Sequence, residues 1–170
     1  MNIIITRTFP PELGGMQNLM WGLTNELSKH CMLKVFADYQ ENYKDFDKKV
    51  SFSIERIGGI KILRKYRKAY LVNEFIKENK ISCIIADHWK SLELIKTNKK
   101  KICLIHSKEI NHSKGTALNK RVLNVLNSVD TVVANSKFTK NLAISCGVEE
   151  NKITIINPGV NPVEELNSKI

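Results

Sequence analysis

The sequence predicts an α/β fold: a Rossmann-like, doubly wound and mostly parallel sheet of about seven strands with helices on both faces. Along the 170 residues, short runs rich in β-branched residues alternate with longer stretches of helical periodicity, as in a series of βαβ units. Several runs are apolar at nearly every position, which is typical of parallel strands buried on both faces. We expect strands at residues 2–6, 32–37, 51–57, 81–87, 101–107, 130–135 and 152–157.

The segments between these strands predict the helices. Residues 15–30 place apolar side chains at i, i+3, i+4, i+7 and i+11, which gives a helix with one apolar stripe. Residues 136–146 have Ser136 or Asn135 as a capping oxygen at the start and Gly147 just past the end. Further helices are expected at 60–79, 90–97 and 115–128, with irregular structure at 38–50 and from Pro158 onward.

The composition limits the class of protein. A formal charge of +10 and 42% hydrophobic residues indicate a basic globular protein with a packed core, and they exclude a mainly disordered chain. No run approaches the ~18 apolar residues of a membrane-spanning helix, and the start lacks the features of a signal peptide, so we expect a cytoplasmic protein. Four cysteines lie far apart without a CxxC pair, which predicts reduced core thiols rather than disulfides or zinc ligands; they are Cys31, Cys83, Cys103 and Cys146.

The loop after the first strand is a candidate phosphate site. Ligands of doubly wound sheets bind beyond the carboxyl ends of the strands, and this loop, TRTFPPELGGMQ at residues 6–17, follows such an end. It is neither a GxGxxG fingerprint nor a P-loop. Its Gly14 and Gly15 lead into a helix whose first N–H groups are unpaired and lie at the positive end of the helix dipole. Phosphate binding is therefore favoured over a flexible turn.

Two histidines are expected at the same edge of the sheet. His106 ends one expected strand and His88 follows another, so both side chains project where ligands bind. Asp87 and Glu109 are carboxylates of the same region, although their spacing does not mark a general acid and base pair. We interpret His106 as the leading functional candidate.

The helix expected at 60–79 carries an arc of four basic residues. The opposite arc is apolar, which permits two interpretations. The favoured one is an ordinary crossover helix with its apolar face on the sheet and its lysines in water, since every such helix is amphipathic. The other is contact with an anionic membrane surface at the inner face of the membrane. The basic residues are Lys61, Arg64, Lys65 and Lys68.

Four segments together resemble the N-terminal domain of the group 1 (family 4) retaining glycosyltransferases. They are FPPELGGMQNLMWGLTNELSKH at 9–30, IIADHWKSLELI at 84–95, LIHSKE at 104–109 and VVANSKFTKNLAISCGVEENKITIINPGVN at 132–161. The resemblance implies a GT-B architecture, in which two Rossmann-like domains face each other across a cleft. Residues 1–162 would form the acceptor-side domain and 163–170 a tail or the start of the interdomain linker, with the donor-binding domain absent.

The resemblance also implies roles for individual residues. Backbone N–H groups of Gly14 and Gly15 would bind the diphosphate of a nucleoside-diphosphate sugar, and His106 would reach the transferred sugar. The reaction would transfer that sugar with retention to a glycan or lipid-linked acceptor of the cell envelope, without a metal or other cofactor. The acceptor side of the cleft would be lined by His88, Trp89, Glu109 and Ser136.

The sequence departs from the family in one large respect. The family's second domain, with its paired glutamates, is missing, since no glutamate here has another eight positions later. We therefore expect no activity from this polypeptide alone, and self-association through the exposed cleft wall. The alternative function is a non-enzymatic basic module that binds anionic lipid or nucleic acid, although nucleic acid is not an expected partner of the transferase. An NAD-dependent enzyme is disfavoured because the fingerprint is absent and Asp38 is the only candidate carboxylate.

Overall fold

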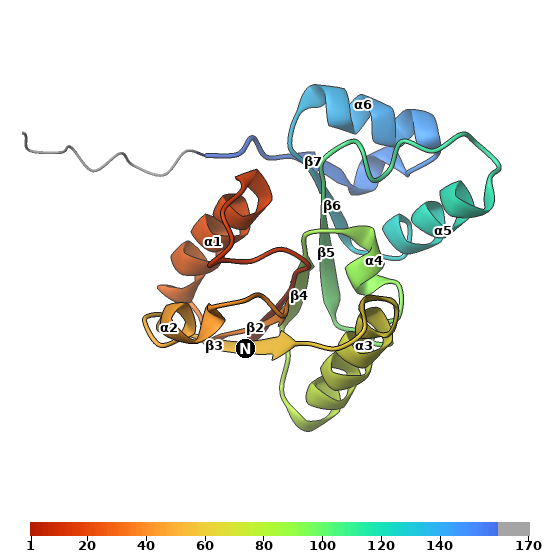
Figure 1. The fold of residues 1–170 in the computed structure, drawn as a ribbon. Coiled ribbons are helices and arrows are strands. Elements are labelled where there is room, and N and C mark those ends of the chain that lie inside the picture. The colour runs from red at the N-terminus through yellow and green to blue at the C-terminus, as the bar shows by residue number, and fades with distance from the viewer. Residues whose placement is uncertain (160–170) are drawn as a thin grey trace, which may run out of the picture.

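The computed structural model describes residues 1–159, so the tail or linker expected at 163–170 lies outside the described residues. These residues form one seven-stranded, all-parallel sheet in the order β3-β2-β1-β4-β5-β6-β7 (Figure 1). The expected Rossmann-like doubly wound fold is therefore confirmed. The strands are β1 (Asn2–Ile5), β2 (Leu33–Asp38), β3 (Ser53–Ile57), β4 (Cys83–Ala86), β5 (Lys100–Ile105), β6 (Thr131–Ala134) and β7 (Ile153–Ile155).

The six α-helices of residues 1–159 follow the expected order, with two differences. A short helix lies in the 38–50 segment, which was expected to be irregular, and the helix expected at 90–97 is a single turn. The helices are α1 (Gly15–Ser28), α2 (Tyr43–Asp47), α3 (Lys61–Glu78), α4 (Trp89–Leu92), α5 (Ala117–Leu126) and α6 (Lys137–Cys146). None of them is long and apolar enough to cross a membrane.

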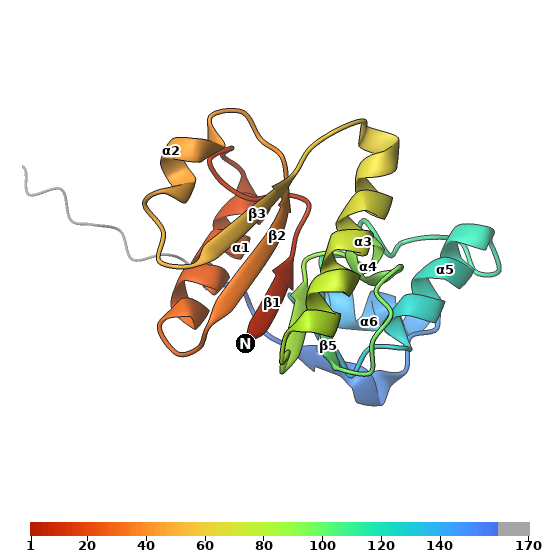
Figure 2. The same ribbon diagram turned by 90° about the horizontal axis from the view of Figure 1, so that it is seen from below.

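The helices divide between the two faces of the sheet. Helices α1 and α2 lie on one face and α3 to α6 on the other (Figures 1 and 2). One core packs Met20 of α1 against Ile4 and Val35, and a larger core packs α3, α4, α5 and α6 around residues such as Phe36 and Trp89. Burial of this much apolar surface from both faces is what holds a parallel sheet together.

The order of the strands places a switch point between β1 and β4. Ile4 of β1 pairs with Val35 of β2 on one side and with Ile85 of β4 on the other. From β1 the chain winds outward to β3 and then returns to β4, so the connections leave β1 and β4 in opposite directions. In open α/β sheets the crevice for ligands forms at the carboxyl ends of such a strand pair.

The ends of α6 agree with the sequence. The Ser136 hydroxyl accepts a 3.1 Å hydrogen bond from the backbone N–H of Thr139, which is the expected cap. Gly147 ends the helix with φ of 108°, in the left-handed region. A Cβ there would also lie 3.1 Å from Leu123, so glycine is required by both conformation and space. The four cysteines are free, as expected, but only Cys103 and Cys146 are buried.

Helix α3 lies with its faces opposite to the favoured interpretation. Its first half exposes most of its apolar side chains and turns Arg64, Lys65 and Lys68 inward, while Lys61 remains exposed. Lys68 is buried, and its ammonium lies 2.5 Å from the carboxylate of Asp38 at the end of β2. With Lys68 turned inward, an apolar face remains in solvent; it consists of Ile60, Ile62, Leu63, Tyr66 and Tyr70.

Candidate functional site

Asp87 joins the loops that follow β1 and β4. Its Oδ2 atom accepts hydrogen bonds from the Thr6 hydroxyl at 2.7 Å and from the backbone N–H of Arg7 at 3.0 Å. The Ser91 hydroxyl donates to Oδ1 at 3.4 Å. Burial raises the pKa of Asp87, although these donors and the charge of Lys68 act in the opposite direction. Asp87 is buried and engaged with the protein, so it holds the switch-point loops and does not face a ligand.

Gly14 and Gly15 deliver the chain into α1 at the carboxyl end of β1. Gly14 is the N-cap, and neither a side-chain cap nor an acidic residue occupies the first turn. The first N–H groups of a helix have no partner within the helix, so they remain available to an anion. A Cβ on Gly15 would meet no atom within 4 Å, whereas one on Gly14 would lie 2.3 Å from Oε1 of Gln17, so the space is open beside Gly15 and covered by Gln17 at Gly14.

His88 is the residue just before α4. Its Nδ1 atom accepts a 3.0 Å hydrogen bond from the backbone N–H of Lys90, so the neutral ring carries its proton on Nε2. Burial, followed by the positive charges of Arg7, Lys90 and His106, lowers the pKa of His88 to about 3. At neutral pH the ring is therefore an uncharged hydrogen-bond donor.

His106 follows β5 and is fixed through its backbone. Its N–H donates a 2.5 Å hydrogen bond to Oε1 of Glu109, and the next residue, Ser107, has φ of 91°. The Nε2 atom of His106 is buried and has no hydrogen-bond partner among residues 1–159. The residue as a whole is half-buried, so part of it is exposed at the carboxyl edge of the sheet.

Three of the expected acceptor-side residues are used within the protein. Trp89 is fully buried and its indole N–H donates a 2.9 Å hydrogen bond to the backbone carbonyl of Glu109. The expectation that Trp89 lines an open cleft is therefore wrong, since a side chain in the core cannot contact an acceptor. Ser136 follows β6 at the same edge as His88 and His106, but its hydroxyl caps α6. The carboxylate of Glu109 holds the backbone of His106.

The basic arc of α3 is neutralised unevenly. Asp38 pairs with Lys68 at 2.5 Å and with Arg64 at 3.6 Å, and Lys68 also donates a 2.6 Å hydrogen bond to the Thr6 carbonyl. Burial lowers the pKa of Lys68, and the Asp38 charge partly opposes that effect. The expectation that Lys68 faces a membrane is wrong because the residue is buried, whereas Lys61 is exposed.

A basic pocket of about 380 Å³ opens on the α3 side of the carboxyl edge. By basic pocket we mean the cavity between the first half of α3, α4 and Arg7 in the loop after β1. Sequence reasoning missed Arg7 and Lys90 as functional candidates, although each lies at the carboxyl end of an expected strand. The basic side chains that line it are Arg7, Lys61, Arg64, Lys65, Lys68, Lys90 and Arg121.

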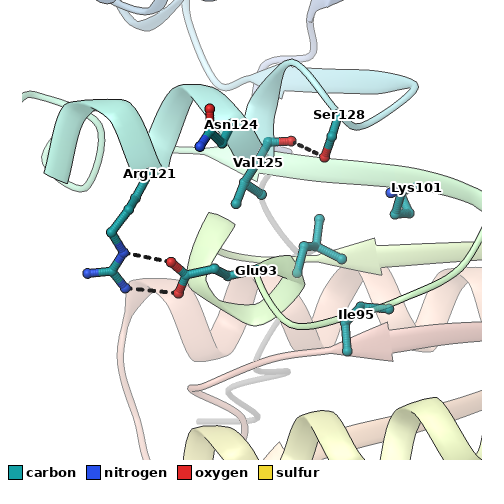
Figure 3. Close-up of a pocket in the computed structure, with 8 residues that line it drawn as sticks. Glu93, Ile95, Lys101, Arg121, Asn124, Val125 and Ser128 are labelled. Atoms are coloured by element: carbon teal, nitrogen blue, oxygen red, sulfur yellow. Dashed lines mark hydrogen bonds and ion pairs between the residues drawn. The ribbon is translucent and has the colours of Figure 1, made fainter. Parts of the chain in front are cut away.

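A second cavity, of about 250 Å³, lies between α4, α5 and the start of β5 (Figure 3). The guanidinium of Arg121 and the carboxylate of Glu93 form a two-pronged ion pair at its side, with N–O distances of 2.7 and 2.9 Å. The Ser128 hydroxyl donates to the Val125 carbonyl at 2.8 Å. These polar groups are paired with the protein, and Lys101 marks the amino end of β5, away from His88 and His106.

The acidic residues of residues 1–159 do not gather into a metal site. No group of three or more His, Cys, Asp or Glu side chains in that range is placed to hold an ion. One Asp-x-Asp tripeptide occurs, at Asp45 and Asp47. The Asp47 carboxylate binds the guanidinium of Arg56 at 2.7 and 3.1 Å.

Solved structures share this fold at low sequence identity. Anabaena HepE in complex with UDP-glucose matches 95% of this chain with a TM-score of 0.72 and 15% identity. The lipopolysaccharide outer core galactosyltransferase WaaB, in its apo form, matches 96% with a TM-score of 0.60 and 15% identity. The UDP-N-acetylglucosamine 2-epimerase of Rickettsia bellii matches 93% with a TM-score of 0.66 and 10% identity. The chain spans 44%, 46% and 45% of these proteins, respectively.

These likenesses show the fold, which is one Rossmann-like half of a GT-B architecture. Because one of the three proteins is an epimerase, the fold by itself does not select transfer over another reaction. No curated protein matches the sequence significantly. The model of Glycosyltransferase Family 4, however, matches residues 13–164, which is most of the chain and includes Gly14, Gly15, His88 and His106. The chain therefore belongs to Glycosyltransferase Family 4.

Proposed function

We propose that this chain forms the acceptor-side half of a glycosyltransferase, which moves a sugar from a nucleoside-diphosphate sugar to a glycan or lipid acceptor with retention. The observation that carries the proposal is the position of the candidate groups in a Family 4 chain. The Gly14–Gly15 loop follows β1 and His88 follows β4, the two strands at the switch point of the sheet.

The start of α1 supplies the electrostatic part of the proposed mechanism. As the bond between the sugar and the diphosphate breaks, negative charge develops on the leaving phosphate oxygen. Backbone N–H groups at Gly15 and the residues after it point at that charge without any rearrangement, because the helix fixes them. The first turn has neither a side-chain cap hydrogen bond nor an acidic residue, although the amide of Gln17 lies beside Gly14.

The histidines supply polar contacts to the two sugars. His106 follows β5 and is half-buried, and the transferred sugar would contact the part of this residue that is exposed. His88 is neutral at working pH and presents its Nε2–H as a donor to an acceptor hydroxyl. Asp87 links the loop after β4 to the loop after β1 through its hydrogen bonds and contacts neither sugar.

Completion of the site requires a second domain. We propose that transfer needs a donor-binding domain in addition to residues 1–162, because a cleft with one wall lacks half of its transition-state contacts. Leu13 and Phe138 support this, since they are 88% and 71% exposed at the edge where such a domain would close. The same exposed groups favour self-association of the isolated chain, which light scattering measures.

A transfer assay tests the proposal. The chain is mixed with a donor-binding domain of the family supplied in trans, and transfer of labelled sugar to a glycan or lipid acceptor is measured. We expect His106→Ala to lower kcat about 100-fold and His30→Ala, an exposed control, to change it less than about twofold. Added EDTA should leave the rate unchanged. Transfer with equal rates in both variants would exclude the role of His106, and absence of both transfer and binding by calorimetry would exclude the proposed function.

The exposed face of α3 favours a second candidate role, contact with an anionic membrane. Ile62, Leu63 and Tyr70 are 80%, 58% and 64% exposed, and Lys61 and Arg67 are exposed on the same helix. Apolar and aromatic side chains interleaved with basic ones suit the interface of an anionic bilayer. Such a face suits a lipid surface better than duplex DNA, because apolar side chains can insert into a bilayer but gain little from contact with a phosphate backbone.

Vesicle binding tests this second role. Leu63→Gln with Tyr70→Gln should weaken binding to phosphatidylglycerol vesicles about tenfold, since two apolar side chains that would insert into the bilayer are removed. Met32→Gln is the control, because Met32 is 71% exposed and lies next to β2 at the amino edge of the sheet. Equal binding of the double variant and the control would exclude the α3 face.

A further inference from the structure

The basic pocket carries more positive charge than the protein neutralises. Seven cationic side chains line it. Four of them pair with Asp38 or Glu93, so two carboxylates serve four cations. Arg7, Lys61 and Lys90 form no ion pair within the described part of the chain. Asp87 is a third carboxylate nearby, since its charge acts on Lys68. Seven cationic side chains thus face three carboxylates around a volume of about 380 Å³, an excess of four.

Packing holds several of these charges close together. The Lys90 ammonium lies 5.2 Å from the centre of the buried Trp89 ring, and the Arg121 guanidinium carbon lies 5.5 Å from the same centre. The pKa of Lys90 is lowered, first by burial and then by the charges of Arg7 and Arg121. Like charges gathered without counter-charges destabilise the unliganded protein, and a bound anion would relieve that repulsion.

The pocket is separate from the proposed site of the donor diphosphate. Gly14 and Gly15 begin α1, which covers one face of the sheet, whereas the pocket is formed by α3 and α4 on the other face (Figure 1). Its neighbour is His88, whose pKa is lowered by burial and then by the charges of Arg7 and Lys90. The pocket therefore belongs to the side of the crevice that we assign to the acceptor.

We propose that the basic pocket binds the phosphate group of a phosphorylated acceptor, with Arg7 and Lys90 as its contacts. That the ligand is the acceptor rests on the proposed function, whereas the phosphate is inferred from the pocket alone. A phosphate monoester or diphosphate carries about two or more negative charges at neutral pH, which matches an excess that one carboxylate would not offset. Arg7 offers a planar fork for two phosphate oxygens and Lys90 a point charge.

Calorimetric titration with inorganic pyrophosphate tests the pocket. We expect wild-type protein to bind pyrophosphate, and Arg7→Gln with Lys90→Gln to weaken binding at least about tenfold. The matched control is Lys96→Gln with Lys99→Gln, which removes two charges from exposed positions just before β5. It should bind within about twofold of wild type. No binding by wild type, or equal binding by the two double variants, would overturn the proposal.

Two further arms identify the source of the phosphate. If it is a lipid headgroup, pyrophosphate will displace the protein from phosphatidylglycerol vesicles, and the Arg7→Gln, Lys90→Gln variant will bind those vesicles poorly. If it belongs to a water-soluble sugar phosphate, glucose 1-phosphate will compete with pyrophosphate while vesicle binding stays unchanged. If neither competes, the pocket does not bind phosphate esters and the proposal fails. Because pyrophosphate binding needs no sugar transfer, a failed transfer assay would leave this result standing.

Discussion

The hydroxyl of Thr6 donates a 2.7 Å hydrogen bond to the carboxylate of Asp87, and this bond joins the end of β1 to the end of β4. The two strands are neighbours in space but lie some eighty residues apart in the chain. The bond thereby joins the loop that leads to Gly14 to the loop that carries His88.

Replacement of Asp87 should loosen this junction. Asp87→Ala removes the acceptor for the Arg7 N–H and leaves the Thr6 hydroxyl with the Thr8 carbonyl, at 2.8 Å, as its acceptor, so we expect a loss of about 2 kcal/mol of unfolding free energy. Urea denaturation measures the change. Asp45→Ala is the control, since the Asp45 side chain is 86% exposed, and it should change stability by less than about 0.5 kcal/mol. Similar losses in both variants would show that Asp87 has no special structural role.

The buried ion pair of α3 predicts a second stability effect. Lys68→Ala leaves Asp38 and the Thr6 carbonyl without the ammonium, so we expect a loss of about 3 kcal/mol. Lys61→Ala, on the exposed surface of the same helix, should be nearly neutral. Thermal or urea unfolding of the two variants separates these expectations. A neutral Lys68→Ala would mean that the rotation of α3 is set by something other than this pair.

The low pKa of His88 predicts a dependence of stability on pH. The pKa is about 3 in the folded protein and 6.5 in the unfolded chain, so between these values the unfolded chain binds more protons. Stability is therefore lost as pH falls below about 6.5. Between pH 7 and pH 5 this group should account for about 2 kcal/mol of that loss.

The variant His88→Asn isolates this contribution. Asparagine keeps an acceptor for the Lys90 N–H but does not titrate, so the variant should lose about 2 kcal/mol less than wild type over the same pH range. Urea denaturation at both pH values gives the difference. Parallel pH profiles of variant and wild type would mean that His88 is protonated in the folded protein.

The start of α1 predicts a charge-specific effect on donor binding. Gly15→Asp adds a carboxylate where the diphosphate is proposed to bind, and it should weaken nucleotide-sugar binding about tenfold or more. Gly15→Asn has the same shape without the charge and should bind much closer to wild type. Neither change should reduce stability greatly, because a Cβ at Gly15 meets no neighbour and acidic residues suit the first turn of a helix. Equal affinities of the two variants for the nucleotide sugar would mean that its diphosphate does not bind at this helix end.

The sequence predicted the sheet because local signals and burial agree in parallel strands. All seven strands formed within about two residues of their expected bounds, since apolar β-branched runs have few other stable arrangements. The ends of α6 were equally clear, because Ser136 and Gly147 act on their own backbone neighbourhood.

Side-chain orientation was predicted less well because distant residues decide it. The faces of α3 are set by Asp38 at the end of β2, and no local pattern tells whether the basic or the apolar arc turns inward. Trp89 is drawn into the core, where the Glu109 carbonyl, twenty residues away, accepts from its indole. The excess charge around Arg7 and Lys90 likewise depends on which carboxylates lie near, and only the folded chain shows that.

Backbone amide NMR shows whether a nucleotide sugar binds at the carboxyl edge of the sheet beside β1 and β5. UDP-glucose, the ligand present in the HepE structure, is titrated into ¹⁵N-labelled protein mixed with an unlabelled donor-binding domain of the family. We expect the largest changes in amide chemical shift at Gly14, Gly15, Met16 and His106, and we expect these changes to be lost in Gly15→Asp. Changes confined to other regions, or no change with saturating ligand, would contradict it.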